Sequence, residues 1–166
     1  AERPIVLAGG GVMLSGAEQE LLEFAEEYGL PVVTSMDGKG SIVEDHPLAL
    51  GVVGGNGGKK TSNRAAEEAD VLVAVGTQLD STTTLKGRLL EDKQVVQLDM
   101  EAQQLGKNTA VEVSLLGDAQ LALADLTEAG RGFAVSHERE TWVAELREAL
   151  AEEQALAEEQ ARSYDG

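Results

Sequence analysis

The 166-residue sequence has no cysteine, two histidines, and aromatic side chains at 3% of its positions. Without cysteine the chain can form neither disulfides nor thiolate metal sites, and His46 and His137 are far apart, which disfavours a zinc site. No run approaches the roughly 18 apolar residues that a membrane-spanning helix requires, and the first residues do not have the layout of a signal peptide. We therefore expect a soluble, cytoplasmic protein without a membrane partner or structural zinc.

Basic residues are also scarce. Lysine and arginine total 13 against 30 aspartates and glutamates, which gives a formal charge of −17 at pH 7, and the carboxylates are spread along the whole chain. Such a charge disfavours nucleic acid as a partner, because the phosphates would be repelled. A dispersed acidic excess is typical of salt-adapted proteins, in which molar salt screens the repulsion. The composition therefore favours a halophile, with an ordinary acidic mesophile protein as the alternative.

Apolar runs alternate with helical patterns along most of the chain. The run at 5–8 ends at three glycines, and a helix that begins at a Ser15/Glu18 capping box and closes at Gly29 leads to a second apolar run at 31–34. Further strands are expected at 71–75, 95–98 and 110–115, a short element near 48–50, and helices at 63–69 and 119–129. A short helix at 85–90 is one of two interpretations of the segment after Asp80. Continuously apolar strands that alternate with helices predict a doubly wound α/β fold with a mostly parallel sheet.

The last part of the chain has a different pattern. Gly130, Arg131 and Gly132 indicate a linker, after which residues 136–162 read as one long acidic helix. Its apolar stripe comprises Trp142, Leu146, Ala149, Leu150 and Leu156. We therefore divide the chain into an α/β domain at 1–130 and a linker with a C-terminal helical extension at 131–166. The helix is expected to lie along the domain surface or to cross to a neighbouring domain.

Two glycine-rich segments invite a phosphate-binding interpretation. Gly9, Gly10 and Gly11 lie between the first strand and the first helix, where doubly wound sheets place phosphates, yet the third glycine of the dinucleotide fingerprint falls on Leu14. These glycines either contact a nucleotide or simply form a turn. The segment 54–61 does not have P-loop spacing, so a flexible loop is the better interpretation.

Polar residues follow two of the expected strands. Asp80 precedes four hydroxyl side chains after the strand at 71–75, and Asp99 ends the strand at 95–98. Ligands bind at the carboxyl ends of strands in open α/β sheets, where these carboxylates could accept ribose hydroxyls. The alternative is that each caps a turn or short helix. No paired nucleophile and base can be assigned, so the sequence predicts no catalytic residues.

Taken together, six segments resemble the central domain of thiamine-diphosphate-dependent enzymes, the family that includes acetolactate synthase. The resemblance covers roughly residues 3–126. The segments that carry it are RPIVLAGGG at 3–11, GLPVVTS at 29–35 with GKG at 38–40, DHPLALG at 45–51, ADVLVAVG at 69–76, QLD at 97–99 and GDA at 117–119.

The resemblance implies a six-stranded parallel sheet that lies between an N-terminal and a C-terminal thiamine-binding domain of the same polypeptide. Thiamine diphosphate and Mg²⁺ would be bound by those two domains, so no activity is expected for this piece alone. The parent would be a homo-oligomeric carboligase or decarboxylase acting on 2-oxo acids, a transferase or a lyase.

In acetolactate synthase the central domain also holds FAD, and the resemblance implies a site for FAD or ADP here. The residues that the resemblance assigns to this site are Gly9, Gly10, Gly11, Thr34, Ser35, Met36, Leu50, Gly51, Gly76 and Asp99. Asp80 is added to the site because it follows the strand at 71–75. Flavin-binding members have an Arg-Phe-Asp-Asp-Arg run where this chain has residues 78–82, QLDST, without either arginine. A His-Gly pair is likewise replaced by Val53-Gly54. FAD, an ADP-like ligand and an empty cleft all stay open.

Two other functions remain as alternatives. The chain could be a free-standing Rossmann-like nucleotide-binding module, although a nicotinamide-dependent deacylase usually carries a zinc-binding cysteine quartet that is absent here. It could also be a purely architectural domain in which the glycines form turns only.

Overall fold

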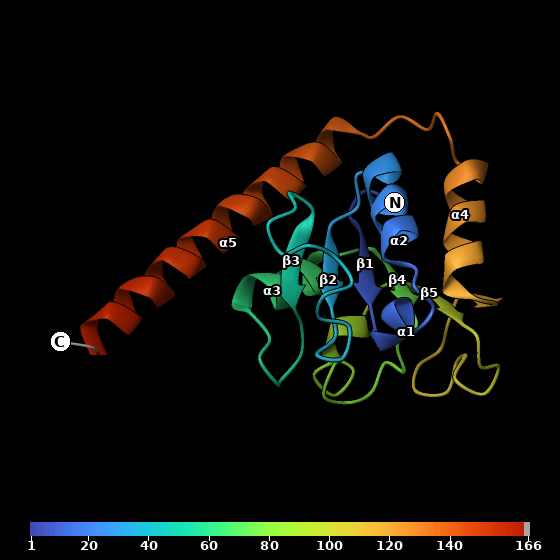
Figure 1. The fold of residues 1–166 in the computed structure, drawn as a ribbon, viewed down its shortest axis with the longest axis horizontal. Helices are drawn as coiled ribbons and strands as arrows, with labels where there is room; N and C mark the ends of the chain where they lie inside the picture. Colours follow the sequence, from blue (N-terminus) through green and yellow to red (C-terminus); the bar gives the residue numbers. More distant parts are fainter. Residues whose placement is uncertain (165–166) are drawn as a thin grey trace.

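The computed structural model describes residues 1–164 and contains one parallel sheet of six strands (Figure 1). Its strands are β1 (Pro4–Ala8), β2 (Val32–Thr34), β3 (Ala49–Val52), β4 (Val71–Val75), β5 (Gln94–Asp99) and β6 (Val113–Leu116). Their order in the sheet is β3-β2-β1-β4-β5-β6, and every neighbouring pair is parallel. The predicted doubly wound α/β fold is therefore confirmed.

Strand β1 occupies the centre of the sheet and is fully buried. It pairs with β2 through Val6 and Val32 on one side, and with β4 through Val6 and Val73 on the other. Because the strand order reverses between β1 and β4, the chain leaves these two strands toward opposite faces. A crevice forms at such a point, beyond the carboxyl ends of the strands.

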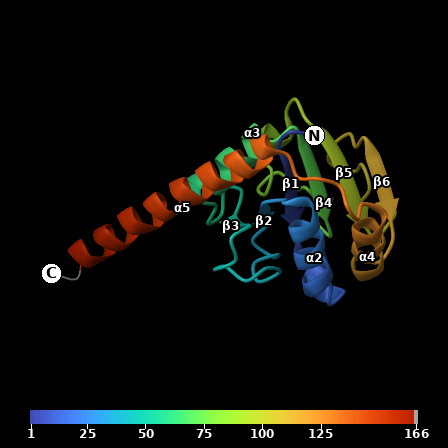
Figure 2. The same ribbon diagram turned by 90° about the horizontal axis from the view of Figure 1, so that it is seen from above.

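Helices cover both faces of the sheet (Figure 2). Successive side chains of a strand point to opposite faces, so Ile5 and Leu7 join one apolar core, whereas Val6 and Ala8 join the other. The first core is closed by α3 (Lys60–Glu68), the short 3₁₀ helix η1 (Arg88–Leu90) and α5 (His137–Tyr164). The second is closed by α1 (Gly10–Leu14), α2 (Glu18–Tyr28) and α4 (Ala119–Ala129).

Helix α5 is bound to the domain over its first half only. Trp142, Leu146 and Leu150 are buried against the sheet core. Residues 154–163 are all exposed, and Figure 1 shows this half of the helix extending away from the domain. The predicted long helix is confirmed, and of its expected apolar stripe Trp142, Leu146 and Leu150 are buried, whereas Leu156 is 59% exposed on the projecting half.

Charged side chains from distant segments hold both ends of α3. At its start, the Glu153 carboxylate of α5 accepts hydrogen bonds from the backbone N–H groups of Lys60 and Thr61, at 2.9 and 3.0 Å. At its end, Lys93 Nζ donates to the carbonyl oxygens of Ala66, at 2.8 Å, and of Ala69, at 3.2 Å. A carboxylate at the amino end and an ammonium at the carboxyl end both complement the helix dipole.

Several expected boundaries are corrected. The capping box is wrong: Ala17 is the N-cap of α2 without a side-chain bond, and Ser15 Oγ instead donates to the Gly11 carbonyl at 2.7 Å. Helix α3 starts three residues earlier than expected and β6 starts three later. The helix expected at 85–90 shrinks to η1. No helix in the described residues is long and apolar enough to cross a bilayer.

Candidate functional site

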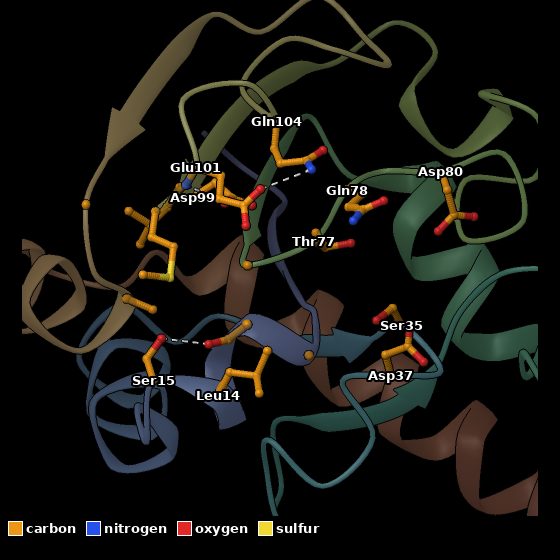
Figure 3. Close-up of a pocket in the computed structure, with 17 residues that line it drawn as sticks. Leu14, Ser15, Ser35, Asp37, Thr77, Gln78, Asp80, Asp99, Glu101 and Gln104 are labelled. Atoms are coloured by element: carbon orange, nitrogen blue, oxygen red, sulfur yellow. Dashed lines mark hydrogen bonds between the residues drawn. The ribbon is translucent and has the colours of Figure 1, made fainter.

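A cleft of about 430 Å³ lies at the carboxyl ends of the strands (Figure 3). Its walls come from the segments that follow β1, β2, β4, β5 and β6, and it lies at the point where the strand order reverses. The lining residues are Gly10, Gly11, Leu14, Ser15, Ser35, Asp37, Gly76, Thr77, Gln78, Asp80, Leu98, Asp99, Met100, Glu101, Gln104, Gly117 and Ala119.

The floor of the cleft is made by glycines that touch one another. A Cβ built on Gly9 would lie 2.2 Å from the Gly76 carbonyl oxygen, and one on Gly11 would lie 2.7 Å from the Gly76 Cα. The backbone N–H groups are also in use: Gly9 donates to the Val75 carbonyl at 2.8 Å, and Gly11 donates to that of Gly76 at 3.0 Å. These glycines let the β1–α1 turn pack directly on the end of β4.

Gln97 shapes the wall above β5. The side chain is buried, and its Nε2 donates to the carbonyl oxygens of Thr77, at 3.3 Å, and Gln104, at 3.1 Å. Its Oε1 accepts from the Gly106 N–H at 2.9 Å. One buried amide thus joins the end of β4 to the loop that carries Glu101 and Gln104.

Asp80 and Asp99 both accept hydrogen bonds from the turns that follow them. Asp80 Oδ1 accepts from the N–H groups of Thr82, at 2.8 Å, and Thr83, at 2.9 Å. These hydrogen bonds hold the pKa of Asp80 below its ordinary value, and the bond from the Thr83 N–H has the largest effect. Burial acts in the opposite direction but is outweighed. Asp99 Oδ1 accepts from the Glu101 N–H at 2.9 Å. Asp80 is therefore a carboxylate at neutral pH, and each residue caps the turn after its strand.

Charge in the cleft has one sign. Asp37, Asp80, Asp99 and Glu101 line it, and no lysine, arginine or histidine is among its lining residues. Figure 3 shows Asp37 and Asp80 on one side of the opening and Asp99 and Glu101 on the other, with Thr77 and Gln78 between them. The cleft therefore presents an acidic, hydroxyl- and amide-bearing surface to a ligand.

The structure gathers part of the predicted site. Gly10, Gly11, Ser35, Gly76, Asp80 and Asp99 line the cleft, and Gly9 packs beneath its floor. Met36 lies in an adjoining hollow that Asp37 and Asp80 also line. Thr34, Leu50 and Gly51 line a separate cavity of about 100 Å³ together with Lys59, so the structure does not place them with the others.

Sequence reasoning did not single out several cleft residues. Met100 and Gly117 directly follow their strands and Thr77 comes two residues after β4, so extending the strand-end rule would have found them. Asp37 and Gln104 come from irregular loops and had no such signal. Within residues 1–164, no group of three or more histidine, aspartate or glutamate side chains is placed to hold a metal ion.

Comparison with known proteins gives the family of most of the chain. Residues 1–126 match the family model described as "Thiamine pyrophosphate enzyme, central domain". The chain is 40% identical to a "Probable acetolactate synthase large subunit" of Methanocaldococcus jannaschii, over 89% of this chain and 25% of the relative. It is 44% identical to the protein of the same description from Methanococcus aeolicus, over 76% of this chain and 21% of the relative.

A plant relative gives the same result: the "Probable acetolactate synthase 2, chloroplastic" of Oryza sativa subsp. japonica is 38% identical, over 74% of this chain and 18% of the relative. The chain thus spans about a quarter or less of the length of these relatives. The family model covers most of the chain, and the sheet has the six parallel strands that the resemblance implied, so the chain belongs to the family of thiamine pyrophosphate enzyme central domains.

Proposed function

We propose that this chain is the central scaffold of a thiamine-diphosphate-dependent carboligase or decarboxylase that acts on 2-oxo acids. The observation that carries the proposal is the match of residues 1–126 to the central domain of the family. The relatives named acetolactate synthase favour carboligation, in which two 2-oxo acids are joined, over simple decarboxylation.

The cofactor that performs the chemistry belongs to other parts of the parent polypeptide. Thiamine diphosphate supplies carbanion chemistry next to a carbonyl, and the protein supplies binding, orientation and electrostatics. We assign thiamine diphosphate and Mg²⁺ to the N- and C-terminal thiamine-binding domains that the resemblance implies, for which the greater length of the relatives leaves room. The parent is a cytoplasmic homo-oligomer in this proposal.

In this proposal residues 1–130 form the scaffold, and residues 131–166 connect it to the C-terminal thiamine-binding domain. The projecting half of α5 is exposed over residues 154–163, whereas its first half is anchored by Trp142 and Leu146. A helix that is fixed at one end and free at the other suits a connection to the C-terminal thiamine-binding domain.

For the strand-end cleft, the resemblance implies FAD or ADP, and the residues of this chain fit part of such a ligand. Asp99, at the end of β5, can accept ribose hydroxyls, as acidic residues do in nucleotide-binding sheets. A diphosphate meets no cationic side chain among the lining residues. The scaffold role does not depend on either ligand.

Salt adaptation is a separate part of the proposal and follows from the charge of −17. The Debye length falls from about 10 Å at 0.1 M salt to about 3 Å at 1 M, so dispersed carboxylates cease to repel one another. The melting temperature should therefore rise as KCl is raised from about 0.1 to 2 M. A melting temperature that is independent of KCl would argue for an ordinary acidic mesophile protein.

Activity of the full-length polypeptide tests the main proposal. Purified enzyme should convert pyruvate to acetolactate, and omission of either thiamine diphosphate or Mg²⁺ should abolish the reaction. The matched control is the 166-residue chain alone, which should be inactive under the same conditions. If the folded full-length protein converts no 2-oxo acid, the proposal is wrong, and a nucleotide-binding module or a purely architectural domain becomes the better interpretation.

A further inference from the structure

We infer that the strand-end cleft of this chain excludes phosphate-bearing nucleotides, so that the thiamine enzyme built around it works without bound flavin. The inference rests on the proposed function, and it disagrees with the FAD or ADP that the resemblance implies. It follows from the charge, the hydrogen bonding and the packing of the cleft itself.

The charge of the cleft opposes a diphosphate. Asp37, Asp80, Asp99 and Glu101 line a space of about 430 Å³ without a lysine, arginine or histidine among the lining residues. A diphosphate would bring further negative charge among these carboxylates. Phosphate sites in proteins are instead built from cationic side chains and free N–H groups. The hydrogen bonds that lower the pKa of Asp80 keep that carboxylate charged at neutral pH.

Two of the three glycines that follow β1, Gly9 and Gly11, do not offset this charge. The N–H groups of Gly9 and Gly11 donate to the carbonyl oxygens of Val75 and Gly76, so neither is free for a phosphate. Gly76 donates its own N–H to the Leu98 carbonyl at 2.9 Å. Close packing of Gly9 and Gly11 on Gly76 accounts for the absence of side chains there. The glycines therefore serve the contact between the β1–α1 turn and the end of β4.

Two lining carboxylates can be changed without disturbing the fold. Asp37 and Glu101 are exposed, the Asp37 side chain makes no hydrogen bond among those the structure shows, and the Glu101 carboxylate makes one long bond of 3.5 Å to Gln104. Replacing both by lysine changes the local charge by four units. The matched control replaces Glu91 and Glu112, which precede β5 and β6 at the opposite edge of the sheet and are equally exposed.

The experiment titrates the full-length polypeptide with FAD and with ADP, followed by flavin fluorescence and by calorimetry at about 0.1 M KCl. The native protein should purify without flavin absorbance and show no saturation by either ligand up to about 1 mM. Asp37→Lys/Glu101→Lys should tighten both affinities by about tenfold or more, because repulsion becomes attraction. Glu91→Lys/Glu112→Lys should leave them unchanged, and circular dichroism should show that both variants are folded.

Three results would overturn the inference. The first is native protein that carries stoichiometric flavin, the second is saturation by FAD or ADP with a Kd below about 10 µM, and the third is an equal effect of the two variant pairs. A failure of this inference is distinguishable from a failure of the proposed function. Acetolactate formation is measured without added flavin, whereas flavin binding is measured without substrate.

Discussion

Gly11 and Gly76 meet backbone to backbone: a Cβ built on either would lie 2.7 Å from the Cα of the other. The contact seats the first turn of α1 on the end of β4 and so builds the floor of the cleft. No side chain can enter it unless two pieces of main chain move apart.

Gly11→Ala should therefore lower the free energy of unfolding by about 1–3 kcal/mol, the usual cost of overpacking. Urea unfolding followed by circular dichroism measures the change. Gly117→Ala is the matched control, since Gly117 also lines the cleft but its Cβ would meet nothing within 4 Å. Equal losses in the two variants would show that the Gly11–Gly76 contact is not the cause.

Gln97→Leu should lower the free energy of unfolding by about 1–3 kcal/mol. A leucine of similar size cannot make the hydrogen bonds of Gln97, so the carbonyl oxygens of Thr77 and Gln104 and the N–H group of Gly106 lose their partner. Thermal unfolding gives the size of the loss. Gln94→Leu, at an exposed position of the same strand, should stay within about 0.5 kcal/mol of the native protein. A neutral Gln97→Leu would mean that water can replace these hydrogen bonds.

Glu153→Gln should destabilise the protein by about 1 kcal/mol at neutral pH, as the loss of a helix cap does. Burial alone would raise the pKa of Glu153, but hydrogen bonds from Thr61 and Lys60 outweigh it and lower the pKa below its ordinary value of 4.5. The carboxylate thus contributes stability that is fully present above pH 4.5 and is lost as pH falls through the folded-state pKa.

Unfolding free energies of the native protein and of Glu153→Gln should therefore converge as the pH is lowered into this acidic range. Glu152→Gln is the control, because Glu152 is exposed and makes no side-chain bond among those the structure shows. A difference between the native protein and Glu153→Gln that is constant with pH would contradict the capping role.

The free energy of unfolding of a chain that ends at Glu153 should lie within about 0.5 kcal/mol of that of the 166-residue chain, since residues 154–163 are all exposed. Leu146→Ala, in the buried half of α5, should instead cost about 2–5 kcal/mol through the cavity that it leaves. Guanidinium unfolding compares the two. Destabilisation by the shortened chain would mean that the projecting half of α5 stabilises the domain without packing on it.

Much of the fold could be predicted from the sequence because each signal was local. The buried runs that became β1 and β4 are continuously apolar, and strands with helices between them can only form a covered parallel sheet. Asp118 directly precedes the helix expected at 119–129, a position where aspartate is a common cap, and its carboxylate accepts the Leu121 N–H at 3.2 Å. Signals of this kind act between residues a few positions apart.

The predicted Ser15/Glu18 capping box does not form, because Ser15 has another hydrogen-bond partner nearby. A Ser-x-x-Glu pattern is compatible with a cap, but Ser15 lies at the end of α1, where the Gly11 carbonyl is within reach of its hydroxyl. Local chemistry offered two hydrogen-bond partners, and the tight turn over Gly76 decided between them.

The strands, most of the helices and the sheet class follow from local sequence patterns, because hydrophobic period and turn residues act over short distances. The surface that the cleft presents to a ligand depends instead on how distant segments pack together. Asp37 comes from the loop after β2, whereas Glu101 and Gln104 come from the loop after β5, and the meeting of the two loops depends on how the chain closes around β1 and β4. The same holds for Leu156, whose exposure depends on where the domain surface ends beneath α5, a boundary that no local pattern encodes.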